Sequence, residues 1–180
     1  MNRVIAVVGM CGSGKSELTG MFRADGYDSI HFGDVTMNEM KRRGMEVCEK
    51  NERAIREEVR AKYGLGAYAV LLLPEIMEKA EKTPLVLDGL YSWSEYKILK
   101  EKLGDLLQVW AIVTDASVRR ERLAHRPVRP LTAEEVDRRD AAEIENLEKG
   151  GPIAAADRFL VNNGPLDELR AQYAALTARL

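Results

Sequence analysis

The segment at positions 9–16, Gly-Met-Cys-Gly-Ser-Gly-Lys-Ser, has the residue types and the spacing of a loop that binds phosphate groups. Its three glycines permit the unusual backbone dihedrals that turn peptide N–H groups toward phosphate oxygens. The ammonium group of Lys15 can reach the β- and γ-phosphates, and the hydroxyl group of Ser16 can bind magnesium. The segment therefore predicts binding of ATP with Mg2+ through Gly9, Cys11, Gly12, Ser13, Gly14, Lys15, Ser16 and Glu17.

Two aspartates stand where predicted strands end. Asp88 follows the apolar run 85–87, which places it beside the phosphate loop, where it could hold magnesium or a magnesium-bound water. Asp34 is expected to face the same cleft, as a general base toward a hydroxyl acceptor or as a group that orients a phosphate acceptor. Both carboxylates could instead cap a turn or a helix. His31 is expected to pack beside the core.

Arginines are concentrated in one part of the chain. Phosphoryl transfer needs positive charge on the transferring group, and the planar guanidinium group suits that task. Arg122 and Arg126 are four residues apart, which predicts that they share a helix face and that they are catalytic. The other arginines of this segment could partly form a solvated face with glutamates. The seven are Arg119, Arg120, Arg122, Arg126, Arg129, Arg138 and Arg139.

Arg56 and Arg60 have the same four-residue spacing in a different predicted helix. They are predicted to bind the substrate by gripping an acceptor phosphate. An equally good interpretation is a surface face of ion pairs with neighbouring glutamates. The residues alone leave both interpretations open.

The elements that must position these residues alternate between strands and helices. Short apolar runs predict strands at 4–8, 29–32, 85–87, 106–113 and 159–161. Helices are predicted at 15–22, 34–43, 51–62, 67–81, 93–102, 117–125, 132–148 and 166–180, with Asn51 as an N-cap and a capping box at 132–135. This alternation predicts an α/β fold with a parallel sheet, whose ligands gather at the carboxyl ends of the strands.

The composition excludes several classes of protein. The 180 residues fit one domain, and 46% apolar with 31% charged residues is typical of a globular protein. A net charge of -2 gives no general attraction to nucleic acid or to anionic membranes. No apolar run approaches the ~20 residues that a membrane span needs. We expect a cytoplasmic protein without nucleic-acid or membrane partners; its oligomeric state is left open.

These features together resemble the P-loop nucleoside-monophosphate kinase class, especially its dephospho-CoA kinase-like and adenylate-kinase-related members. The resemblance implies a three-layer α/β/α P-loop fold with a five-stranded parallel sheet in the order 2-3-1-4-5. It also implies a single domain over 1–180, an acceptor-binding helical region at about 34–81 and a small helical lid at about 119–148. The matching stretches are 5–16, 33–34, 60–69, 87–89, 119–126 and 156–164.

The resemblance implies ATP-dependent transfer of the γ-phosphoryl group to a nucleotide-type small molecule, a nucleoside monophosphate. It also makes Asn163 and Gly164 candidates for the adenine side of the ATP site. Three departures leave the acceptor open: no arginine follows Asp34, no Asp-x-Asp stands there, and Tyr91 replaces an arginine. The alternatives are a dephospho-CoA kinase acting on a ribose hydroxyl and an ATPase switch acting through a protein partner. ATP is not distinguished from GTP.

Overall fold

The computed structural model describes residues 1–127 and 130–179 of the chain. The strands are β1 Val4–Val8, β2 Asp28–His31, β3 Leu85–Asp88, β4 Leu107–Val113 and β5 Arg158–Val161. The helices are α1 Lys15–Ala24, α2 Asp34–Arg42, α3 Glu49–Tyr63, α4 Ala67–Lys82, α5 Trp93–Leu103, α6 Ala116–Ala124, α7 Ala133–Glu145, α8 Gly150–Ala154 and α9 Leu166–Thr177. A 3-10 turn, Gly104–Leu106, links α5 to β4.

The five strands form one parallel sheet in the order β2-β3-β1-β4-β5, which confirms the predicted order. All five residues of β1 are fully buried, because a central parallel strand is covered on both faces. Val7 pairs with Asp88 on one side and with Trp110 on the other. The strand that leads into the phosphate loop therefore lies in the middle of the sheet, next to the strand that ends at Asp88.

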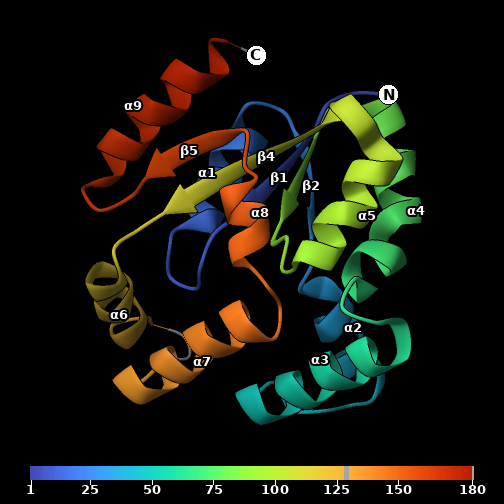
Figure 1. The fold of residues 1–180 in the computed structure, drawn as a ribbon, viewed down its shortest axis with the longest axis vertical. Coiled ribbons are helices and arrows are strands. Elements are labelled where there is room, and N and C mark those ends of the chain that lie inside the picture. Colours follow the sequence, from blue (N-terminus) through green and yellow to red (C-terminus); the bar gives the residue numbers. More distant parts are fainter. Residues whose placement is uncertain (128–129, 180) are drawn as a thin grey trace.

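Two apolar clusters sandwich the sheet between layers of helices. Residues of α4 and α5 pack on one face with Leu87 and Val109, and residues of α1 and α9 pack on the other with Trp110 and Leu160. Figure 1 shows α2, α3, α6 and α7 on the side toward which the arrows of β2 and β4 point, while both chain termini lie at the opposite end. In the described residues, no helix is long and apolar enough to cross a membrane.

One local prediction was wrong, and one short helix was not predicted. Helix α3 begins at Glu49 with Cys48 as its N-cap, whereas Asn51 lies inside the helix and its side chain donates to the carbonyl oxygen of Glu46. The short helix α8, which the glycine pair at 150–151 opens, was not predicted; Pro152 fits there because a first-turn N–H needs no helical partner. The capping box of Thr132 and Glu135 is confirmed. Arg129 and part of the predicted lid lie outside the described residues.

Candidate active site

A cleft of about 610 Å3 opens at the carboxyl end of the sheet. The first wall is the phosphate loop with the start of α1. The second wall, opposite the first, comes from α6, α7 and the segment before α8. Asp88 and Tyr91 line its base at the end of β3. The position agrees with the rule that ligands of open α/β sheets bind beyond the carboxyl ends of the strands.

The phosphate loop curls around its own lysine. The Lys15 ammonium donates to the carbonyl oxygens of Gly9, at 2.9 Å, and Met10, at 3.1 Å. Burial, together with the nearby charge of Lys149, lowers the pKa of Lys15 to about 8. Gly14 has a φ of 98°, and a side chain there would collide with the amide of Asn162. The close approach of the loop to its surroundings therefore requires glycine at this position.

The turn after β5 is tied to the loop by hydrogen bonds. The Asn162 side-chain amide donates to the Ser13 carbonyl oxygen at 2.8 Å, and the Thr114 hydroxyl donates to the same oxygen at 3.0 Å. Asn163 accepts a hydrogen bond from the backbone N–H of Asp115 at 2.8 Å, while Gly164 lines the cleft. The adenine-side roles of Asn163 and Gly164 stay predictions.

Arg119 is a buried member of the arginine segment. Its side chain forms a two-pronged pair with Asp140, at 2.9 and 2.7 Å, and donates to the Cys11 carbonyl oxygen at 3.1 Å. It thus joins α6, α7 and the phosphate loop, so the alternative interpretation of a solvated helix face does not hold for Arg119. Arg120, in contrast, forms an exposed pair with Asp137.

Arg122 and Arg126 both line the cleft. Arg122 donates to the carbonyl oxygen of Asn162 at 2.8 Å, which holds its guanidinium group beside the end of β5. Arg126 reaches the cleft from beyond the helix, because α6 ends at Ala124. The prediction that the two arginines share a helix face was therefore wrong, although both line the cleft. Their catalytic role stays a prediction.

His31 and Asp34 are arranged differently from the prediction. His31 is exposed and lines the cleft, so its assignment to the core was wrong. Asp34 is not among the described residues that line the cleft; its carboxylate contacts the His31 ring nitrogen Nδ1 at 2.9 Å. The reason is that β2 ends at His31 and Asp34 already starts α2. Any role of Asp34 in catalysis or substrate binding stays a prediction.

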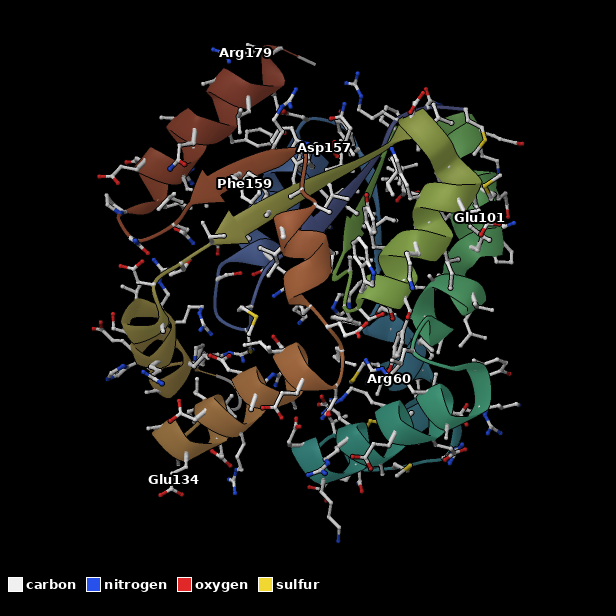
Figure 2. All side chains as sticks on the ribbon, in the orientation of Figure 1. Arg60, Glu101, Glu134, Asp157, Phe159 and Arg179 are labelled. Carbon is white, nitrogen blue, oxygen red and sulfur yellow. The ribbon has the colours of Figure 1, made fainter. Side chains whose placement is uncertain are left out.

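The arginines of α3 lie away from the phosphate loop. Arg56 forms ion pairs with Glu49, at 2.6 Å, and with Glu52, at 3.3 Å. The guanidinium group of Arg60 lies 5.1 Å from the centre of the Tyr68 ring, and Figure 2 shows it on the side of α3 that faces the rest of the molecule. Neither arginine is among the described residues that line the cleft. Their role in binding an acceptor stays a prediction.

Ser16 and Asp88 fit the requirements of a magnesium ion. Both line the cleft, and both offer the oxygen donors that this hard cation prefers. The described residues contain no group of three or more histidine, cysteine or acidic side chains that could hold a metal. That sparse set suits magnesium bound to phosphate oxygens, which uses one or two protein ligands and retains waters.

A buried ion cluster lies opposite the loop. Glu143 of α7 accepts a hydrogen bond from the Cys11 backbone N–H at 3.2 Å, and its carboxylate is 2.9 Å from the ammonium group of Lys149. Lys149 is 1% exposed, and its ammonium lies 5.4 Å from the centre of the Tyr91 ring. Arg139 approaches the other oxygen of Glu143 at 3.5 Å. These side chains bring the second wall of the cleft into direct contact with the loop.

Comparison with known proteins identifies the family. Residues 5–148 match a family model described as an AAA domain. A UPF0200 protein from Thermococcus gammatolerans is 31% identical over 181 residues, which cover 98% of this chain and 95% of the relative. The chain belongs to the AAA domain family and to the UPF0200 proteins.

Solved structures confirm the kinase-like P-loop fold of this UPF0200 protein. A Thermus thermophilus protein, TT1252, has a TM-score of 0.67 at 23% identity and covers 99% of this chain and 98% of its own. A gluconokinase from Sinorhizobium meliloti has a TM-score of 0.57 at 21% identity, and the match covers 98% of this chain and 94% of the gluconokinase. A shikimate kinase from Bacteroides thetaiotaomicron has a TM-score of 0.60 at 19% identity, and the match covers 98% of this chain and 97% of the shikimate kinase. At these identities the likeness establishes the fold alone.

Sequence reasoning missed Glu143 and Lys149 of this UPF0200 protein. Lys149 precedes two glycines at the end of a polar segment, where a lysine is normally on the surface. Glu143 lies in a helix with several other acidic residues, and nothing in its spacing sets it apart. Each becomes visible only when α7 is placed over the phosphate loop.

Proposed function

We propose that this protein is an ATP-dependent phosphotransferase whose acceptor is a nucleotide-type small molecule, a nucleoside monophosphate. The observation that carries the proposal is the charge of the cleft. Five basic side chains, Lys15, Arg122, Arg126, Arg139 and Lys149, line it with three acidic ones, Glu17, Asp88 and Glu143. This excess of positive charge suits a site that holds the phosphates of a donor and an acceptor together.

The residues divide the reaction between them. Lys15 and the loop amides hold the β- and γ-phosphates, and Arg122 with Arg126 stabilises the charge of the transferring group. A magnesium ion held by Ser16 and Asp88 would neutralise phosphate charge. The bond that breaks joins the γ-phosphorus to the bridging oxygen, which leaves with ADP, and the bond that forms joins the same phosphorus to an acceptor oxygen. Helices α6 and α7 on the second wall would help to exclude water.

A hydroxyl acceptor, as in a dephospho-CoA kinase, is the second candidate, and one contact favours it. Asp34 holds the Nδ1 side of His31, whose ring lines the cleft. A carboxylate that accepts from Nδ1–H leaves Nε2 free to take a proton from a hydroxyl group. The pair would thus supply a base that a phosphate acceptor does not need.

The test is an acceptor panel. The protein is incubated with ATP, Mg2+ and each of the common nucleoside monophosphates or dephospho-CoA; ADP release is followed and the phosphorylated product is identified by mass spectrometry. We expect ADP release that depends on one monophosphate. Release that depends only on dephospho-CoA would replace that acceptor with the hydroxyl, and in that case His31→Gln should lower kcat strongly.

The same assay distinguishes a kinase from an ATPase switch. Slow ATP turnover that no acceptor changes, but that a protein fraction of the cell raises, would overturn the proposal in favour of the switch. A Lys15→Ala variant should be inactive in either case, so it serves as the control for background activity.

A further inference from the structure

The buried cluster of Glu143, Lys149 and Arg139 has a geometry that the proposed reaction does not explain. The Glu143 carboxylate occupies a backbone N–H of the phosphate loop, that of Cys11. Inward-pointing loop amides are the groups that bind phosphate oxygens in this motif. A carboxylate oxygen on such an amide therefore stands where an oxygen of a bound phosphate would be.

Glu143 contacts the first half of the loop, next to the residue that holds the Lys15 ammonium group. Cys11 follows Met10, and the Met10 carbonyl oxygen accepts from the Lys15 ammonium at 3.1 Å. In this motif that ammonium reaches the β- and γ-phosphates. Glu143 would therefore compete with the γ-phosphate and would leave the α-phosphate region of the loop accessible.

The cluster also has more positive than negative charge. Glu143 is the counter-ion of Lys149 at 2.9 Å and of Arg139 at 3.5 Å, and Lys15 lies close enough to affect its ionisation. Burial alone would raise the pKa of Glu143, but the charges of Lys149 and Lys15 outweigh it and hold the pKa below its ordinary value. Glu143 is the carboxylate that these three cations share, while Glu49 lies 4.0 Å from Arg139 and Asp88 acts on Lys15. The cleft as a whole still has two more basic than acidic side chains, so further anionic charge would be favourable there.

We propose that Glu143 is a place-holding anion and that Lys149 and Arg139 are ligands of the γ-phosphoryl group. When a triphosphate binds, its terminal oxygens replace the Glu143 carboxylate on the Cys11 amide and take over its ion pairs with the two cations. This inference rests on the proposed nucleotide binding and names the residues that distinguish a triphosphate from a diphosphate. Because Glu143 and Arg139 belong to α7, the exchange also couples that helix to the occupancy of the loop.

Binding measurements test the inference without requiring turnover. Titration calorimetry with Mg2+ compares the β,γ-imido analogue of ATP with ADP. We expect Lys149→Met to weaken binding of the analogue at least tenfold and binding of ADP less than threefold. Lys149→Arg should restore most of the lost affinity. Glu143→Gln should tighten the analogue several-fold, because its neutral amide competes less well for the loop. Glu145→Gln removes one negative charge from an exposed position of the same helix and should change neither affinity.

The double variant Glu143→Gln, Lys149→Met guards against a folding artefact, since it removes both charges of the buried pair. If the pair is only structural, the double variant binds the analogue like the wild type, and the inference fails. If Lys149 is a phosphate ligand, the double variant still discriminates poorly between analogue and ADP. Wild-type protein that binds neither nucleotide would overturn both proposals, whereas selective binding without any kinase acceptor would overturn the proposed function alone.

The chain offers a direct probe of the exchange. It contains two cysteines, so selective labelling with 15N-cysteine gives two backbone amide signals, from Cys11 and Cys48. We expect both the Glu143→Gln change and addition of the ATP analogue to move the Cys11 signal, with ADP producing a smaller shift. A Cys11 signal that does not respond to the Glu143 substitution would contradict the contact.

Discussion

Two pairs of arginines with the same spacing have different environments in this molecule. Arg122 and Arg126 line the cleft from α6 and from the segment after it. In α3, by contrast, Arg56 forms ion pairs with glutamates and Arg60 packs over an aromatic ring. Spacing alone therefore did not determine their role. The difference is the surroundings: α6 lies against the phosphate loop through Arg119, and α3 offers Glu49 and Glu52 within its own first turn.

The comparison extends to burial. The cations of the second wall include Arg119, 6% exposed, and Lys149, 1% exposed, and both contact the loop or its partner Glu143. The ion pairs of α3 lie on the surface, where screening and side-chain entropy reduce their worth. Substitutions in the two regions should consequently differ in size and in kind.

The largest effect on stability is expected at Arg119. Arg119→Met leaves Asp140 and the Cys11 carbonyl oxygen without their buried partner, so we expect the free energy of unfolding to fall by about 3 kcal/mol. Urea denaturation followed by circular dichroism measures this loss. Arg120→Met is the matched control, because its exposed pair with Asp137 should contribute less than about 1 kcal/mol. Equal losses in the two variants would remove the distinction between them.

The next effect concerns rate. Arg122→Ala removes a donor aimed at the transferring group, and we expect kcat with the acceptor found in the panel to fall about 100-fold, or about 2.7 kcal/mol of barrier. The Kd of ADP should change little. Because Arg122 also donates to the Asn162 carbonyl oxygen, a thermal unfolding curve must accompany the assay. A parallel loss of ADP affinity would assign Arg122 to ground-state binding instead.

The contrast between these regions also shows where sequence reasoning succeeds. The phosphate loop and the sheet order could be predicted because glycine spacing and apolar runs are local signals. The contact of Glu143 with Cys11 could not, since it joins positions 132 residues apart. Asp34 was misplaced for a smaller reason: the strand ends at His31, three residues earlier, so the side chain of His31 lines the cleft while Asp34 lies in the first turn of α2.

A smaller effect follows from the buried state of Lys15. Bound phosphates favour its charged form, so the free protein must take up a proton on binding once pH exceeds its pKa of about 8. Nucleotide affinity should be flat below that pH and fall by up to about tenfold per pH unit above it. Calorimetry at pH 7 and 9, in buffers of different ionisation enthalpy, should detect proton uptake at the higher pH alone.

Two variants isolate that effect. In Lys15→Arg the guanidinium group stays charged, so any remaining affinity should lose its dependence on pH in this range. Cys11→Ser removes the nearby thiol and should leave the dependence unchanged. Persistence of the dependence in Lys15→Arg would assign the titration to another group of the cleft.

The smallest effect is expected at Arg56 and decides between the two interpretations of α3. If the arginine belongs to a surface network, Arg56→Ala costs less than about 1 kcal/mol of stability and leaves kcat and the acceptor KM within about twofold. If it grips an acceptor phosphate, the acceptor KM rises at least tenfold while kcat is retained. Arg53→Ala, which loses an exposed pair with Glu57 on the same helix, is the control. Since Glu49 lies 2.6 Å from Arg56 and 4.0 Å from Arg139, removal of Arg56 also frees this carboxylate for the second wall of the cleft. A change in ATP affinity with an unchanged acceptor KM would then show that the two regions communicate through Glu49.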